Sequence, residues 1–474
     1  MLMPQVFKAN DIRGLVQGDN PEWDIAGARA LGAAFATALG LAGSEFIIGR
    51  DMRAGGFELS RAFAEGAMAM GAGVVDIGLA ATDQVWYASG VTGLPAVQFT
   101  ASHNPAQYNG VKFCLPHAAP ITPELMARIR DLATQGDGSS AQGDGSSAQG
   151  DGSSAQGDGP AEPVTRGRLR ELDTLPGYAE RLHSLVDLTG WRPLRVVVDA
   201  GNGMAGHTTP AVLGTLGIEL IGLYLDLDGD FPNHPPNPLE PENLRDARAA
   251  VREHGADLAL VFDGDADRCF IIDEQGEVIS PSVITALIAQ AELAREPGAA
   301  IVVNTVTSAA VGDVVAAAGG RLVVGKVGHT YLKALMAQHN AIFGGEHSGH
   351  YYFRDFWGAD TGMLAALHVL SLVGRSALPA SRLADAVPSY AASGELNSVV
   401  PDPKATMQQV AEAFAGDGRL DWTDGLTVRG EDWQVSVRAS NTEPLLRLNV
   451  EARQPETMTR LRDRALAVIR QGER

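Results

Sequence analysis

The sequence predicts an α/β fold in which three similar mixed α/β domains precede a C-terminal α+β domain around a central cleft. Two patterns support this fold class. Amphipathic helical segments alternate with short apolar strands, and this alternation starts three times along the chain. Beyond about residue 388, strands of alternating polar and apolar residues take over. A length of 474 residues suits three or four domains, because domains commonly hold ~100–200 residues.

The first unit alternates helices and strands from near its beginning. Apolar residues recur at spacings of three and four over 25–39, which predicts an amphipathic helix. We expect a strand at 46–48, a second helix at 59–70, and strands at 74–77 and 96–99.

The same rhythm restarts near residue 194 and again near residue 281. The elements expected in these two units are strands at 194–198, 218–224, 258–262, 270–272, 301–303, 321–324 and 341–343, and a helix at 243–254. In the last unit we expect strands at 433–437 and 445–450 and a helix at 456–469. A polar cluster follows a short apolar strand in each unit. Ligands of α/β sheets bind beyond the carboxyl ends of strands, so we expect these clusters to face one cleft.

The composition excludes several classes of partner. Lys and Arg number 37 and Asp and Glu 57, a formal charge of −20, which disfavours nucleic acid and anionic membranes. The N-terminal stretch has no signal-peptide core, and no apolar run reaches ~18 residues, so we expect no membrane span. Cys114 and Cys269 make neither a disulfide framework nor a zinc cluster, which favours a reducing cytoplasm.

A low-complexity repeat interrupts the pattern at 135–159. It reads QGDGSSA three times and then QGDG, with no apolar residue larger than Ala. Such a segment has nothing to bury against the entropy of ordering its backbone, so we interpret it as a flexible linker. We therefore expect domains at 1–134, 160–278, 279–386 and 387–474, with the linker at 135–159.

The hexapeptide DGDADR follows the expected strand at 258–262. It places Asp263, Asp265 and Asp267 at alternate positions of a tight loop, where three carboxylates suit one hard cation such as Mg²⁺ or Ca²⁺. An EF-hand loop is excluded, because Arg268 stands where that loop needs Gly. The plain alternative is a solvated acidic turn, although carboxylates this close repel unless a cation lies among them.

The segment TASHNP follows the strand at 96–99 and places Ser102 at a strand end. A serine there can act as a nucleophile or carry a phosphoryl group. His103 and the downstream Lys112 supply positive charge. The G-x-S-x-G motif of hydrolases is absent, and a Ser-Asn-Pro turn is also common as plain structure.

The segment GEHSGH follows the third unit's last expected strand. Its Glu346, Ser348 and His350 alternate, which predicts one face of an extended loop that binds sugar hydroxyls. A zinc site that includes His347 is the alternative, but no well-spaced third histidine completes it. His329 in GKVGH lies in another loop-like stretch.

The segment RASNTEPLLR separates the strands expected at 433–437 and 445–450. Two guanidiniums with hydroxyl, amide and backbone donors predict a phosphate cradle, and an ordinary hairpin turn is the alternative. The residues of the cradle are Arg438, Ser440, Asn441, Thr442 and Arg447. Arg13 in DIRG and Arg50 and Arg53 in GRDMR add cations near the first unit's loops.

Together these motifs resemble the α-D-phosphohexomutase superfamily, specifically its bacterial phosphomannomutase/phosphoglucomutase branch. Seven motifs stand in family order: DIRG, TASHNP, YNGVK, DGDADR, GKVGH, GEHSGH and RASNTEP. The resemblance implies a heart-shaped four-domain fold. It also implies reversible conversion of hexose 1-phosphate and hexose 6-phosphate through a phosphoserine enzyme and a hexose 1,6-bisphosphate intermediate.

The resemblance also implies a role for each matching residue. Mg²⁺ is held by Asp263, Asp265, Asp267 and a phosphoryl oxygen on Ser102. The implied catalytic residues are Ser102, Lys112, His329, Arg13, Arg268 and His103, with Lys112 and His329 favoured for proton transfer. The implied substrate-binding residues are Glu346, Ser348, His350, Arg438, Ser440, Asn441, Thr442 and Arg447. The family often has Tyr where this chain has Asn10.

Other functions remain open at this point. Phosphoglucosamine mutase is a rival within the family, and a metal-dependent sugar phosphatase would use the same aspartates but admit water. A non-catalytic sugar-phosphate binding protein is disfavoured, because Ser102 and the three aspartates are all present. We expect hexose phosphates as partners, a monomer or weak dimer, and a positive cleft within an acidic shell.

Overall fold

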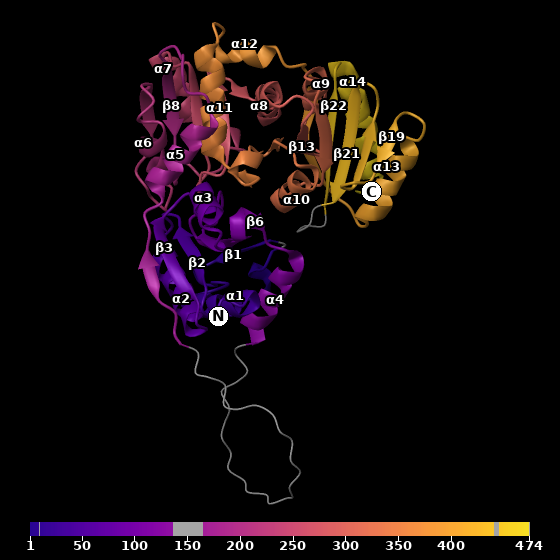
Figure 1. Ribbon diagram of the computed structural model, residues 1–474. Coiled ribbons are helices and arrows are strands. Elements are labelled where there is room, and N and C mark those ends of the chain that lie inside the picture. The colour runs from indigo at the N-terminus through magenta and orange to yellow at the C-terminus, as the bar shows by residue number, and fades with distance from the viewer. Residues whose placement is uncertain (9, 136–164, 440–444, 474) are drawn as a thin grey trace, which may run out of the picture.

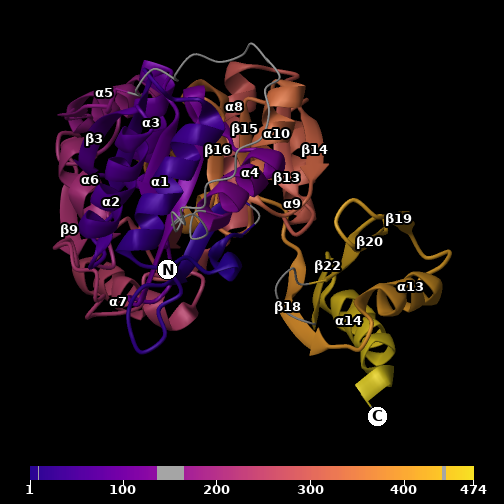
Figure 2. The ribbon, with the colours of Figure 1, turned by 90° about the horizontal axis from the view of Figure 1, so that it is seen from below.

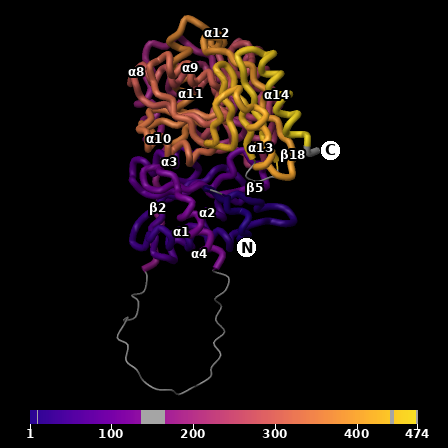
Figure 3. Tube along the Cα trace, turned by 90° about the vertical axis from the view of Figure 1, so that its right-hand side faces the viewer, coloured from indigo at the N-terminus to yellow at the C-terminus, as the bar shows by residue number. Residues whose placement is uncertain are grey.

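The computed structural model describes residues 1–473 except 9, 136–164 and 440–444. The expected linker lies outside the described residues except for Gln135, the last residue of a helix. Figure 1 shows the N-terminal domain below the second and third domains, and Figure 3 shows the same order from the side.

The first domain contains one mixed sheet. Its strands are β1 (Asp11–Leu15), β2 (Glu45–Arg50), β3 (Gly73–Leu79), β4 (Ala96–Phe99), β5 (Tyr108–Leu115), β6 (Ala119–Pro120) and β7 (Leu169–Glu171), and its helices are α1 (Ile25–Leu39), α2 (Gly56–Ala69), α3 (Thr82–Thr92) and α4 (Pro123–Gln135). Alternate residues of β2 enter two cores, Phe46 and Ile48 with α1 and α2, and Ile47 with α3. Helices therefore cover both faces of this sheet.

The second and third domains each contain a five-stranded sheet. The second has α5 (Leu175–Leu185), β8 (Arg195–Asp199), α6 (Ala205–Val212), β9 (Glu219–Leu223), α7 (Arg245–His254), β10 (Leu258–Phe262), β11 (Cys269–Asp273) and β12 (Val278–Ile279). The third has α8 (Pro281–Arg295), β13 (Ala300–Asn304), α9 (Ala309–Ala317), β14 (Arg321–Gly325), α10 (His329–His339), β15 (Phe343–Gly345), β16 (Tyr351–Phe353), β17 (Ala359–Asp360), α11 (Gly362–Arg375) and α12 (Ala380–Asp385).

One topology recurs in all three domains. A central strand (β2, β8 or β13) pairs in parallel with the next strand on one side (β3, β9 or β14) and with the one after that on the other (β4, β10 or β15). That last strand then pairs antiparallel with its successor (β5, β11 or β16). The three loops at these hairpins are topologically equivalent, and they carry Ser102, the three aspartates and Glu346, respectively.

The fourth domain has a different, fully antiparallel sheet in the order β18-β22-β21-β20-β19. Its elements are β18 (Ala391–Val399), α13 (Pro403–Ala413), β19 (Arg419–Asp421), β20 (Leu426–Arg429), β21 (Trp433–Ala439), β22 (Leu445–Ala452) and α14 (Pro455–Ile469). Three α/β domains and a C-terminal α+β domain therefore confirm the predicted fold class.

The hydrophobic cores divide the molecule differently from the sheets. One continuous core joins buried residues of the first three domains, among them Trp86, Leu260 and Leu364. The fourth domain has a separate core around Phe414 and Leu461. Figure 2 shows the fourth domain beside the third domain. We infer that the first three domains form a common platform.

Polar contacts connect the fourth domain to the third. Glu451 on β22 accepts a hydrogen bond from the hydroxyl of Ser308 and another, at 3.0 Å, from the backbone N–H of Ala309. Its carboxylate therefore caps the N-terminus of α9. Within the described ranges of the chain, we find no helix that combines the length and the hydrophobicity needed to span a bilayer.

Candidate active site

Ser102 lies in the β4–β5 loop with a left-handed backbone, at φ 50°, and is 1% exposed. Arg53 holds this loop through hydrogen bonds to its backbone. Its guanidinium donates hydrogen bonds of 2.7 Å to the carbonyl oxygens of Ser102 and of Asn104. Arg53 is itself buried, paired with Asp51 at 3.2 Å and lying over the ring of Phe231. The strained serine is therefore held by a rigid, fully buried cation.

The hydroxyl of Ser102 faces the DGDADR loop of the second domain, residues 263–268, which we call the metal loop after its predicted role. It donates to Asp263 Oδ2 at 2.9 Å and accepts from Arg268 at 3.1 Å, and His103 Nδ1 lies 3.2 Å away. The two loops are in direct contact at Gly264, where a Cβ would lie 2.5 Å from the carbonyl oxygen of Ser102. The predicted serine and the predicted acidic loop thus form one cluster.

Asp263, Asp265 and Asp267 are almost fully buried, and each offers an oxygen within 4.8 Å of the others. Lys112 donates to Asp265 Oδ2 at 2.7 Å and to Asp267 Oδ2 at 2.5 Å. The Oδ1 atoms of Asp265 and Asp267 are buried and accept no hydrogen bond from any described residue. Orphaned buried carboxylate oxygens beside a hard oxygen donor set fit a divalent cation such as Mg²⁺.

The charges in this cluster are strongly coupled. Burial and the charge of Asp267 raise the pKa of Asp263 to about 7. Burial also raises the pKa of Asp267, but the charges of Lys112 and His350 outweigh it and hold that pKa well below its usual range. Burial lowers the pKa of Lys112, but Asp265 and Asp267 outweigh it and hold that pKa above its usual range. Lys112 therefore stays an ammonium beside the carboxylates.

Two more predicted residues adjoin the serine loop. Arg13 on β1 donates to the side-chain oxygen of Asn104 at 2.9 Å and to Asp11 at 2.8 Å. His103 contacts the guanidinium of Arg268 through Nδ1. Burial and the charge of Arg268 lower the pKa of His103 to about 2, so its ring is neutral. His103 therefore adds no positive charge, contrary to our expectation from the sequence.

The GEHSGH segment forms a tight turn instead of the extended face that we expected. The backbone N–H of Glu346 donates to the carbonyl of His350 at 3.0 Å. The Glu346 carboxylate is buried and accepts from Asn304 Nδ2 at 2.8 Å and from the hydroxyl of Tyr352. Ser348 and His350 contact each other at 3.0 Å. Short-range bonds across the turn prevent strict alternation of side chains.

This turn contacts the metal loop. An isolated β-bridge joins His350 to Arg268, and His350 Nε2 lies 3.5 Å from Asp267. His347 instead lies 3.1 Å from the hydroxyl of Ser282. Among the described residues, no group of three possible metal ligands includes His347, so the zinc alternative finds no support.

Lys112 and His329, the two residues favoured for proton transfer, line one small cavity between the first and third domains. Asn10 closes its edge with a 2.8 Å hydrogen bond to Thr330. Burial and the charge of nearby Lys333 outweigh the opposing effect of Asp360 and lower the pKa of His329 to about 4. His329 is therefore a neutral base at pH 7, whereas Lys112 is an acid.

Arg438 and Arg447 lie on neighbouring strands of the fourth domain and share Glu395, at 3.9 Å and 3.4 Å. Asp424 lies 3.7 Å from Arg438 and accepts from the backbone N–H of Val327 in the GKVGH loop at 3.0 Å. The predicted cradle residues Ser440, Asn441 and Thr442 lie outside the described residues.

Sequence reasoning missed two supporting residues. It noted Arg53 only as an arginine near the loops, and it did not single out Thr82, which binds Asp265. Two features of the sequence could have identified these residues. Arg53 lies just after an apolar strand, and Thr82 is part of a Thr-Asp pair that begins a helix after β3.

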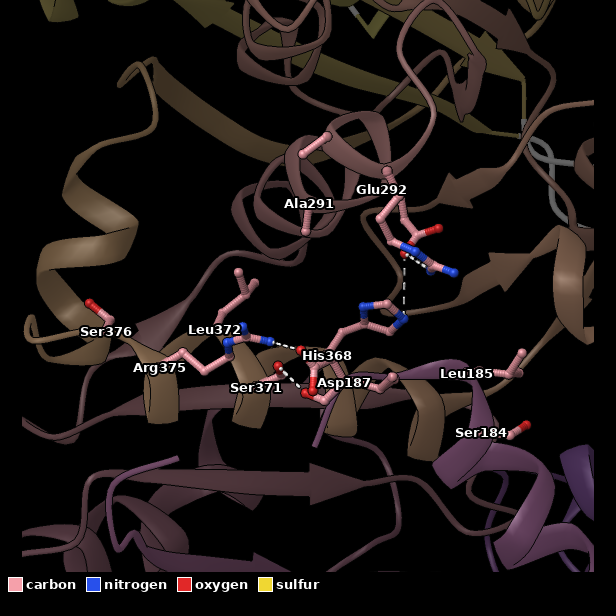
Figure 4. Close-up of a pocket in the computed structure, with 13 residues that line it drawn as sticks. Ser184, Leu185, Asp187, Ala291, Glu292, His368, Ser371, Leu372, Arg375 and Ser376 are labelled. Atoms are coloured by element: carbon pink, nitrogen blue, oxygen red, sulfur yellow. Dashed lines mark hydrogen bonds and ion pairs between the residues drawn. The ribbon is translucent and has the colours of Figure 1, made fainter. Parts of the chain in front are cut away.

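A cavity of about 720 Å³ lies elsewhere, between the end of α5 and the helices α8 and α11. Figure 4 shows the ring of His368 directed at Glu292, with Asp187 and Arg375 farther along the wall. No residue predicted from the sequence for the site lines this cavity. The motifs therefore identify the candidate site better than cavity size does.

Family models named phosphoglucomutase/phosphomannomutase match the chain in four consecutive stretches. Alpha/beta/alpha domain I matches residues 4–139, domain II residues 176–276 and domain III residues 280–390. The C-terminal domain of the same group matches residues 395–468.

Known proteins are similar over nearly the whole chain. A phosphomannomutase of Salmonella montevideo is 38% identical, with 94% of each chain covered. A phosphomannomutase of Escherichia coli is 36% identical, with 98% of each chain covered. The crystal structure of a phosphoglucomutase/phosphomannomutase family protein from Burkholderia thailandensis matches with a TM-score of 0.87 and 31% identity, covering 100% of this chain and 99% of that one.

Proposed function

The chain belongs to the phosphoglucomutase/phosphomannomutase family and is a phosphohexomutase, and on this premise we propose which of its residues carry the reaction. The observation that carries the proposal is the contact of Ser102 Oγ with Asp263 Oδ2 at 2.9 Å. A hydroxyl with a carboxylate and a guanidinium as its neighbours is placed to be a phosphoryl carrier.

The proposed reaction has two transfers. In the first, the bond between phosphorus and Ser102 Oγ breaks as a new bond forms to a free hydroxyl of the hexose phosphate, which gives a hexose 1,6-bisphosphate. In the second, the other phosphoryl group returns to Ser102 after the sugar has turned over, and the isomer leaves. Such transfers depend on positioning and charge neutralisation.

Charge neutralisation falls to the cluster around Ser102. Asp263, Asp265 and Asp267 would hold Mg²⁺, which as a Lewis acid offsets charge on a phosphoryl oxygen. The guanidinium of Arg268, 3.1 Å from Ser102 Oγ, offsets charge on the same group.

The sugar hydroxyl that attacks must lose a proton. We assign its acceptance to His329, since burial lowers the pKa of that ring to about 4 and leaves it neutral. Lys112 is protonated, because Asp265 and Asp267 overcome the effect of burial and hold its pKa above the usual range, and we assign to it the proton that the leaving Ser102 Oγ takes up. Arg13 orients the serine loop through Asn104.

The other phosphate and the sugar are bound by the third and fourth domains. We propose that Arg438 and Arg447 hold the non-reacting phosphate together with Ser440, Asn441 and Thr442, and that Glu346, Ser348 and His350 bind sugar hydroxyls. In support, both arginines face carboxylates that an incoming phosphate can replace.

The substrates that we propose are mannose and glucose phosphates, in line with the relatives named phosphomannomutase. Glucosamine phosphate is the rival substrate and phosphate hydrolysis the rival reaction. The purified protein should be assayed with the 1-phosphates of mannose, glucose and glucosamine, with Mg²⁺ and a trace of hexose 1,6-bisphosphate. Isomerisation of the mannose and glucose phosphates supports the proposal. Isomerisation of glucosamine 1-phosphate alone, or release of inorganic phosphate without isomerisation, contradicts it.

Three further points remain proposals. We propose a cytoplasmic location, supported by the two free, buried cysteines Cys114 and Cys269, and a monomer or weak dimer. We keep the domain division at 278/279 and 386/387. Because β7 pairs with β3 of the first sheet, we place the start of the second domain after Glu171 instead of at residue 160.

A further inference from the structure

The first turn of α3 binds a single residue of the metal loop. The backbone N–H of Thr82 donates to the carbonyl of Asp265 at 3.0 Å, and its hydroxyl donates to Asp265 Oδ2 at 2.6 Å. Both residues are completely buried, although 183 positions separate them. The helix N-terminus also places its positive end against this carboxylate.

These bonds determine how the Asp265 carboxylate is used. Its Oδ2 atom accepts from both Thr82 and Lys112, at 2.6 Å and 2.7 Å. Its Oδ1 atom is buried and accepts from no described residue. Because Oδ2 accepts two hydrogen bonds and Oδ1 accepts none from the described residues, the carboxylate has a fixed orientation. Oδ1 is the oxygen that remains available to a cation.

The same turn of the first domain is anchored to the second and third domains. Asp83, the next residue, accepts at Oδ2 from the hydroxyl of Tyr178 on α5 at 2.7 Å and from Thr361, the N-cap of α11, at 2.6 Å. All three side chains are buried. Figure 1 shows α3 at the end of the first domain that faces the second and third. The hydroxyl of Thr82 therefore lies on a helix turn that buried contacts between the domains hold in place.

We propose that Thr82 is a positioning residue for the metal loop. Its hydroxyl fixes the orientation of the Asp265 carboxylate, so that Oδ1 is free to coordinate a divalent cation. This inference rests on the proposed function, namely that the acidic loop binds Mg²⁺. Partners of metal ligands typically change metal affinity by about 10- to 100-fold when removed. Losing the hydroxyl leaves Lys112 as the one described donor to the Asp265 carboxylate and frees this carboxylate to rotate.

The test compares Thr82→Val with Thr82→Ser and with the matched control Thr92→Val. Thr92 ends the same helix and donates only to the carbonyl of Ala88, one turn earlier. Mg²⁺ affinity is measured by titration calorimetry on each unphosphorylated protein without sugar, so the measurement does not depend on turnover. Thr82→Ala replaces the valine variant if the latter does not fold.

We expect Thr82→Val to bind Mg²⁺ about 10-fold or more weakly, and Thr82→Ser and Thr92→Val to bind like the wild type. In activity assays kcat of Thr82→Val should recover at high Mg²⁺, with KM for hexose phosphate unchanged. Wild-type affinity in Thr82→Val, or equal losses in the valine and serine variants, would overturn this inference alone. Failure of the wild type to bind Mg²⁺ at all, in the unphosphorylated and in the phosphorylated form, would overturn the proposed metal loop as well.

Discussion

Ser102 Oγ lies 2.9 Å from Asp263 Oδ2, although 161 residues separate the two. Both residues follow the third strand of the repeated topology, β4 in the first domain and β10 in the second. The hairpin loop of the third domain reaches the same cluster through His350, 3.5 Å from Asp267. One site is therefore built from equivalent loops of three repeated domains.

Replacing the proposed phosphoryl carrier is the simplest test of its role. We expect Ser102→Ala to lose mutase activity by a factor on the order of 10³ or more, because the proposed transfer then has no carrier. The melting temperature should change little. Activity is measured with a coupled assay, and Ser184→Ala, at an exposed position on α5, is the control. Full activity of Ser102→Ala would show that the carrier is another residue.

Arg53 is expected to hold the serine loop. Arg53→Met removes one partner of a buried ion pair and should lower the free energy of unfolding by about 3–5 kcal/mol in urea titrations. Arg53→Lys keeps the charge beside Asp51 but not the planar set of donors to the carbonyls of Ser102 and Asn104. We expect it to be more stable than the methionine variant but still low in kcat. Wild-type kcat in the lysine variant would argue against this role.

Lys112 neutralises two buried carboxylates. In Lys112→Met, Asp265 and Asp267 lose their ammonium, so the protein without Mg²⁺ should be less stable by about 3–5 kcal/mol. Added Mg²⁺ should raise the melting temperature of this variant more than that of the wild type, because the cation replaces the missing charge. Lys404→Met, at an exposed position, controls for loss of a lysine. Equal Mg²⁺ effects in all three proteins would contradict the proposed metal loop.

His234 of the second domain should make stability depend on pH. Burial lowers the pKa of His234, but the hydrogen bond and charge of Asp199 outweigh it and raise that pKa. The stabilisation is therefore complete below the unfolded value, about pH 6.5, and is lost as pH rises through the higher folded value.

The measurement compares His234→Gln with the wild type by urea unfolding from about pH 5.5 to about pH 9. The stability difference should be largest at the acidic end and shrink at the basic end. His254→Gln, at an exposed position, is the control. A difference that grows with pH would have the wrong sign for this ion pair.

The sequence predicted strands best where an apolar run is short and sharply bounded. The strands expected at 96–99 and 258–262 coincide with β4 and β10. The strand expected at 341–343 is β15 at 343–345, because Gly344 and Gly345 suggest a turn. At Gly345 a Cβ would lie 2.3 Å from Thr285 Oγ1, so close packing against α8 requires glycine in this strand.

Helix α3 was not predicted from the sequence, because its residues show no alternation between a buried and an exposed face. Most of its residues are buried, Thr82, Asp83 and Gln84 among them, so it shows no amphipathic period. Local patterns also cannot reveal partners such as Asp265 or Thr361, which lie far along the chain. The motif residues could be named from the sequence, whereas their supporting contacts depend on how the domains pack.

Labelling of Ser102 tests most directly whether this residue carries the transferred phosphoryl group. Wild-type protein is mixed with radiolabelled hexose 1,6-bisphosphate, quenched rapidly, and digested for mass spectrometry of the peptide that contains Ser102. We expect label on Ser102 at a rate no slower than turnover, and transfer of this label to product when unlabelled hexose 6-phosphate is added. An unlabelled Ser102 during active turnover, or label released only as inorganic phosphate, would contradict the proposed role of Ser102.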